Sequence, residues 1–108
     1  MTQITLNSKD PFEALVIPMV ETNRLKRADY ASDDDMFLNF RRNAEMMDLE
    51  GFDALEDCLS MVSRKFGRIV NLRDREPSNE TVVDSYLDLA VYAILAYGLA
   101  LEAAEGEE

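Results

Sequence analysis

The sequence contains no histidine and no tryptophan, and Cys58 is its only cysteine. Histidine is the commonest general base at neutral pH and the commonest zinc ligand, so its absence argues against zinc chemistry. A single cysteine excludes an intrachain disulfide and a cysteine-rich metal site. Any chemistry must therefore use carboxylates, hydroxyls, amides, lysine and arginine, a set of groups that suits magnesium or manganese.

Positive charge and long hydrophobic runs are also scarce. The chain has 11 basic and 22 acidic residues and a net charge of −11, which would repel phosphates, so we expect no binding to duplex nucleic acid. The apolar run over residues 86–101 would span about 24 Å as a helix, less than a bilayer core of about 30 Å, and it contains Asp88. With no signal-peptide pattern at the N-terminus, we expect no contact with a membrane and a cytoplasmic location.

Apolar residues recur at helical spacing, and no strand pattern competes apart from residues 3–6. The length predicts one domain over residues 1–108, with an irregular lead-in at 1–9 and an acidic tail at 105–108. The expected fold class is therefore all-α, an antiparallel bundle of about four helices. The last helix is apolar nearly all round, which favours completion of the bundle by dimerisation.

Caps and prolines set the expected helix boundaries. Asp10 and Pro11 are a cap and a first-turn proline, so a first helix is expected to run to about Ala28, with a kink or a late start at Pro18. The run Ser32–Asp35 should open a second helix, because acids complement the positive end of the helix dipole. The expected buried stripe of this second helix consists of Met36, Phe37, Phe40, Ala44 and Met47.

A third helix is expected over about residues 52–72, a charged loop over 73–79, and a fourth helix over about 80–104. The apolar stripe of the third helix consists of Phe52, Leu55, Leu59, Val62, Phe66, Ile69 and Val70. If the third and fourth helices are antiparallel neighbours, the start of one lies beside the end of the other.

Asp84 and Asp88 stand four residues apart in the otherwise apolar fourth helix, so they share one face. A carboxylate in such surroundings needs a cation partner. Antiparallel packing would bring Lys65 and Arg68 close to this pair, and one interpretation is a structural salt bridge that fixes the helix register. The other is a divalent metal site, whose ligands would be Glu56, Asp57, Asp84 and Asp88.

Two segments resemble helical nucleotide pyrophosphohydrolases of the MazG and dimeric dUTPase group. Residues 56–60, EDCLS, are similar to the acidic E-x-x-E pair of that group, and residues 84–92, DSYLDLAVY, are similar to its E-E-L-A-D-x-x-x-Y segment. Ser60 and Ser85 stand where that group has carboxylates. Binding of magnesium in the same manner would therefore need Glu56 and Asp84 as replacements.

A closer resemblance is to the nucleotide-modification-associated domain family of phage and bacteria, over about residues 24–97. Asp29-Tyr30, the segment KFGRIVNL at residues 65–72 and the segment at 84–92 carry this resemblance, in the order and spacing of the family. The family is associated with nucleotide handling during phage DNA-base modification. The resemblance implies a nucleotide-binding protein, with Mg-dependent nucleoside triphosphate pyrophosphohydrolase activity as its enzymatic form, located in the host cytoplasm if a phage encodes it.

In this interpretation Glu56, Asp57, Asp84 and Asp88 would hold Mg²⁺, and water activated by the metal would be the nucleophile. Lys65 and Arg68 would neutralise phosphate charge, while Asn39, Asn43 and Tyr30 would read the base or sugar edge. The expected partners are a nucleotide or another phosphorylated small molecule and further copies of the chain. The simpler interpretations are an interhelical hydrogen bond for the asparagines and ordinary packing for the tyrosine.

Two alternatives from other functional classes fit the same sequence. The net charge of −11 is typical of a non-enzymatic acidic interaction protein, such as a phage-type inhibitor that docks on a basic surface. The apolar fourth helix is typical of a purely structural helical dimer module without any ligand.

Overall fold

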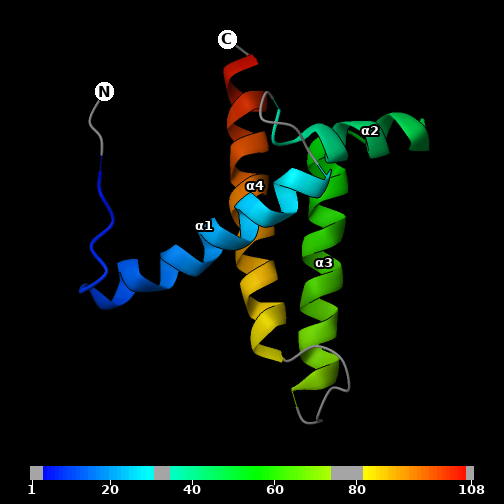
Figure 1. Ribbon diagram of the computed structural model, residues 1–108. Coiled ribbons are helices and arrows are strands. Elements are labelled where there is room, and N and C mark those ends of the chain that lie inside the picture. Colours follow the sequence, from blue (N-terminus) through cyan, green and yellow to red (C-terminus); the bar gives the residue numbers. More distant parts are fainter. Residues whose placement is uncertain (1–3, 31–34, 74–81, 107–108) are drawn as a thin grey trace.

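The computed structural model describes residues 4–30, 35–73 and 82–106, apart from the side chains of residues 26–30, and these residues form four packed helices without a strand. The helices are α1 (Pro11–Tyr30), α2 (Leu38–Met47), α3 (Ala54–Leu72) and α4 (Val82–Gly106). Figure 1 shows α3 and α4 side by side and antiparallel, with α1 crossing α4 obliquely and α2 lying across the start of α3. The all-α prediction is confirmed.

Asp10 caps α1 as predicted, because its Oδ1 accepts hydrogen bonds from two backbone N–H groups of the first turn, each at 3.0 Å. The helix then continues through Pro18 as far as Tyr30. A late start at Met19 is therefore wrong. Proline lacks only its own N–H, so the helix loses the bond to the Ala14 carbonyl while the rest of the ladder holds the chain helical.

α2 begins later than predicted. Oδ1 of Asp35 accepts a hydrogen bond from the Phe37 N–H at 2.9 Å, which stabilises a turn, and the helix starts only at Leu38. The predicted opening at Ser32–Asp34 lies outside the described residues. α2 ends at Met47, and the left-handed backbone of the next residue, Asp48 (φ 48°), lets its N–H donate to the Ala44 carbonyl at 3.2 Å.

The predicted buried stripe of α2 is only partly correct. Phe37 and Phe40 are each 5% exposed, as expected, and Ala44 is half-buried. Met36 and Met47 are 46% and 52% exposed, so their assignment to the core is wrong. Met36 precedes the helix, where helical spacing does not apply, and Met47 is its last residue.

The predicted apolar stripe of α3 is only partly correct. Ile69 is buried and Leu55 packs against the core as predicted, but Cys58 and Lys65, each one residue before a member of the stripe, contact α4. As a result three members of the predicted stripe are exposed at 43%, 60% and 42%, and these are Leu59, Phe66 and Val70. The contact face contains a lysine, which the apolar pattern of the sequence did not suggest.

The core lies where α2 crosses the α3–α4 pair. Phe37, Phe40, Cys58 and Leu99 form one buried cluster. The Tyr92 ring meets the Phe40 ring edge to face, with centroids 6.3 Å apart and an interplanar angle of 71°. This cluster joins α2, α3 and α4, whereas α1 contacts mainly α4.

α4 begins at Val82, and the predicted start at Glu80 lies outside the described residues. By length and composition alone this helix could cross a membrane, because its most apolar 18-residue window has a mean hydropathy of 1.6. Only 11% of that window is buried within the chain. Much of α4 therefore has no cover in the single chain.

Candidate phosphate and metal site

The contact between α3 and α4 contains a shielded ion pair. Lys65 Nζ lies 3.0 Å from Asp88 Oδ2, and their side chains are only 19% and 14% exposed. The antiparallel arrangement places them level with each other, so the salt bridge that the sequence suggested is present. Such shielding strengthens the attraction between the charges, and it also makes either charge costly to leave alone.

Arg68 and Asp84 extend this contact by one turn on each helix. Nε of Arg68 is buried, and Asp84 lies at the exposed start of α4, one turn before Asp88. Both residues also have interaction partners within the protein. Ser85, which follows Asp84 in the sequence, is fully buried.

Glu56 and Asp57 lie at the other end of the α3–α4 pair, because they occupy the first turn of α3. Asp57 accepts a hydrogen bond from Asn43 Nδ2 at 3.2 Å, and Ser60 Oγ donates to the Asp57 carbonyl at 2.6 Å. Eight residues separate Asp57 from Lys65, a rise of about 12 Å. Within the described part of the chain no three acidic or cysteine residues gather as a metal site. The four predicted metal ligands are thus divided into two pairs.

The predicted base-reading residues are also divided from the cations. Asn43 is used in the α2–α3 contact with Asp57, the interhelical hydrogen bond that was the simpler interpretation. Asn39 is exposed one turn earlier on α2. Tyr30 ends α1, and its side chain lies outside the described residues. The asparagines of α2 and the cations Lys65 and Arg68 therefore lie toward opposite ends of α3.

Arg41 is a structural residue that the sequence analysis missed. Its Nε donates to Asp35 Oδ2 at 2.8 Å, and its Nη2 donates to both carboxylate oxygens of Glu102 at 2.9–3.0 Å. The guanidinium carbon also lies 5.6 Å from the centre of the Phe37 ring. The hydrogen bond from Arg41 lowers the pKa of Asp35 below its usual value. The ion pair of Arg41 with Asp35 could have been suggested by the short distance between them in the sequence, whereas the ion pair with Glu102 could not.

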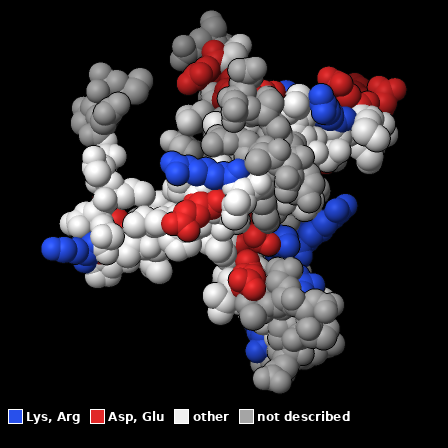
Figure 2. Space-filling model, viewed as in Figure 1, with Lys and Arg blue, Asp and Glu red and all other residues white. Residues whose placement is uncertain are grey.

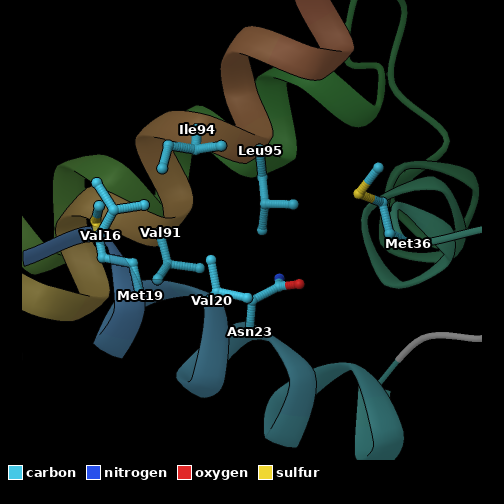
Figure 3. A pocket seen from close by; sticks show the side chains of 8 residues that line it. All are labelled: Val16, Met19, Val20, Asn23, Met36, Val91, Ile94 and Leu95. Carbon is cyan, nitrogen blue, oxygen red and sulfur yellow. The ribbon is translucent and has the colours of Figure 1, made fainter. Parts of the chain in front are cut away.

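An apolar cavity of about 150 Å³ lies between α1, α4 and the turn before α2. Figure 3 shows side chains of α1 and α4 pointing into it, with Met36 closing one side. Among the described residues that line it, Asn23 supplies the only polar side chain and none is a cation. This cavity therefore suits an apolar ligand better than a phosphate. No family model, curated protein or solved structure matches this chain.

Proposed function

We propose that the chain binds nucleotides, or other phosphorylated small molecules, through Lys65 and Arg68 of α3 beside Asp84 and Asp88 of α4. The observation that supports this proposal most is the shielded Lys65–Asp88 ion pair, with the buried Nε of Arg68 one turn further along α3. Two cations and two carboxylates at one helix contact can receive a phosphate together with its metal.

Magnesium is the metal that these groups fit. It is commonly held by one or two protein carboxylates together with substrate phosphates, so Asp84 and Asp88 suffice without the distant Glu56 and Asp57. When bound, Mg²⁺ would neutralise phosphate charge and lower the pKa of a water molecule. Asp88 would turn from Lys65 to the metal, and the ammonium group of Lys65 would then bind the phosphate.

The test is a thermal melt with Mg²⁺ or Mn²⁺ and each of a panel of canonical and modified nucleoside triphosphates. We expect at least one nucleotide to raise the melting temperature, and Asp88→Asn to abolish that rise. Glu102→Gln is the matched control, because Glu102 is also an ion-paired acid of α4 but lies far from Lys65. The absence of any rise across the panel would contradict the proposal.

Pyrophosphohydrolysis is the further hypothesis, and it has a separate readout. Hydrolysis of a nucleoside triphosphate in this way yields a nucleoside monophosphate and pyrophosphate, which phosphorus NMR distinguishes from loss of a single phosphate. A ligand that raises the melting temperature without yielding pyrophosphate would indicate binding alone.

The second candidate function is a non-enzymatic acidic interaction protein. The antiparallel pair brings the start of α3, with Asp53 and Glu56, to the same end as Glu102 and Glu105 of α4, and Figure 2 shows acidic groups over this end. Binding to oligolysine should then weaken steeply between about 50 and 500 mM salt. Binding that does not change at the higher salt concentration would argue against electrostatic docking.

A further inference from the structure

An uncharged strip runs along the outside of α4. Tyr86, Tyr97 and Leu101 are 56%, 66% and 43% exposed, and helical geometry places them within about 80° of one another around the helix. Ala90 and Ala93 lie between the two tyrosines on the same strip. Three acids of α4, Asp84, Asp88 and Glu102, lie on other sides of the helix, and Glu105 lies at the end of the strip, one turn after Leu101.

The three exposed apolar residues of α3 continue this strip. Leu59, Phe66 and Val70 share one side of their helix. The α3 strip lies about 100° around its helix from the contact with α4, and the α4 strip about 150° around its helix from the contact with α3, so the two strips are neighbouring surfaces on the side of the pair away from α1, which crosses α4 in Figure 1. We call this surface the α3–α4 face, and it consists of Leu59, Phe66, Val70, Tyr86, Tyr97 and Leu101.

The chain exposes far more surface than a compact monomer. A monomer of 12.3 kDa exposes about 6,100 Å², and this chain exposes 8422 Å², roughly 2,300 Å² more. Its radius of gyration is 15.7 Å, against about 13 Å for a compact domain of this length. The excess is larger than the approximately 800 Å² that each partner buries in a standard interface, so there is enough surface for a stable dimer.

We propose that a second copy of this chain covers the α3–α4 face. Tyr86, Ala90, Ala93 and Tyr97 follow the 4-3-4 spacing at which one helix packs along another, and the alanines allow close approach at the centre. A face with little charge is also the surface on which two chains of net charge −11 can meet with least repulsion. This arrangement would complete a bundle from two α3–α4 pairs.

A lipid bilayer is the competing occupant of the same surface. From Leu89 to Leu101 the 13 residues between Asp88 and Glu102 span about 20 Å, which is less than a hydrocarbon core of about 30 Å. The uncharged stretch of α4 is therefore short for a membrane span, which favours the protein partner.

The proposal does not depend on nucleotide binding, and its test measures mass in the absence of nucleotide. Sedimentation equilibrium over about 1 to 200 µM protein should give twice the chain mass of 12.3 kDa at the upper concentrations. Raising NaCl from about 50 to 500 mM should strengthen the dimer, because salt screens the repulsion between like-charged chains. Docking on a basic partner would show the opposite salt dependence.

The face is tested by Phe66→Ser with Tyr97→Ser, which removes two aromatic rings that are already exposed in the single chain and so spares its core. We expect the dimer dissociation constant to rise by at least about 100-fold, with an unchanged helical circular dichroism spectrum. The matched control is Phe12→Ser with Met46→Ser, two residues that are 73% and 83% exposed on α1 and α2, and it should leave the constant unchanged.

Three results would overturn the proposal. The first is a wild-type chain that stays monomeric at about 200 µM in half-molar salt. The second is a dimer that the control variant disrupts and the face variant does not. The third is a monomer that co-sediments with vesicles of phosphatidylcholine and phosphatidylglycerol through residues Phe66 and Tyr97, which would assign the face to lipid.

Discussion

Gly98 of α4 is a residue whose missing side chain decides local packing. A Cβ built at this position would lie 2.8 Å from Cζ of Phe37, which is closer than real Cβ contacts. The Phe37 ring is 5% exposed and belongs to the core, so it has little freedom to move away. The glycine therefore allows the segment before α2 to pack closely on α4.

The first prediction compares two helical glycines. Gly98→Ala should lower the free energy of unfolding by about 1 kcal/mol, because overpacking against Phe37 exceeds the gain in helix propensity. Gly67→Ala in α3 is the matched control, since a Cβ there meets nothing within 4 Å, and it should raise stability by about 0.5–1 kcal/mol. Urea denaturation measures both, and equal gains in the two variants would contradict the packing argument.

Cys58 is fully buried, and its Sγ donates a hydrogen bond to the Tyr92 carbonyl at 3.4 Å. Burial, assisted by the charge of Asp57, raises the pKa of this thiol from 9.0 to about 11. The thiolate is the reactive form of cysteine, so the native protein should resist alkylation. A lone cysteine in this setting is part of the core.

The second prediction is a pH dependence due to this thiol. Between about pH 9 and 11 the unfolded chain loses the Cys58 proton while the folded chain keeps it, so the free energy of unfolding should fall as the pH rises. The loss should approach about 2 kcal/mol at pH 11. Cys58→Ser keeps a donor for the Tyr92 carbonyl but has no such titration, so the difference between the two proteins isolates the effect. Parallel urea curves across this pH range would contradict it.

At the scale of elements, local signals predicted the helices well. Asp10 caps α1 through its own side chain, as predicted. The third helix was predicted from about residue 52, and it begins at Ala54 with Asp53 as its cap. The start of α2 was predicted too early, because the Asp35 side chain stabilises a turn that precedes the helix. Turns and helices begin with the same types of residue, so the sequence does not distinguish them here.

Which face a helix buries was harder to predict than where the helix lies. The apolar stripe through Leu59 and Phe66 is the more hydrophobic side of α3, yet α4 packs on the side of Cys58 and Lys65. Antiparallel geometry did indicate that Lys65 and Arg68 would lie near Asp84 and Asp88, and the structure shows the pair formed by Lys65 and Asp88. The Arg41 contact with Glu102 could not be predicted, because 61 residues separate them and only the assembled helices bring them together.

The third prediction concerns the coupling between α3 and α4. Asp88→Asn should cost about 3 kcal/mol without any ligand, because it leaves the shielded Lys65 ammonium without its counter-charge. The additional substitution Lys65→Met should cost much less in that background than in the wild type, giving a coupling energy of about 2 kcal/mol. Urea denaturation of the four proteins measures the cycle, and additive effects would show that this ion pair does not hold the helices in register.

At the scale of the whole molecule, the described residues form a core at one end of the α3–α4 pair, and apolar side chains elsewhere on this pair stay exposed. The buried cluster around Phe40 and Cys58 joins three helices at the α2 end. On the other side of the hairpin, Phe66 and Tyr97 are among the most exposed aromatic residues. The sequence indicated a surplus of apolar surface on α4, but only the packing of α1 and α3 shows which side of that helix remains uncovered.

Because the buried core and the exposed apolar surface are separate, the folding of one chain and the association of two chains depend on different residues. A net charge of −11 on 108 residues opposes both compaction and association. Salt should therefore act on each process in the same direction. Measuring its effect on folding alone requires a chain that does not dimerise.

The fourth prediction uses the Phe66→Ser/Tyr97→Ser variant for that purpose. Raising NaCl from about 20 to 500 mM should stabilise the monomer by about 1 kcal/mol, equivalent to about 4–8 °C in melting temperature, because it screens repulsion among the excess acids. The salt also weakens the half-exposed pairs of Arg41, but the Lys65–Asp88 pair is shielded and should change little. Scanning calorimetry of the variant at both salt concentrations measures the shift. A melting temperature that falls with salt would mean that surface ion pairs, such as those of Arg41, outweigh the net repulsion.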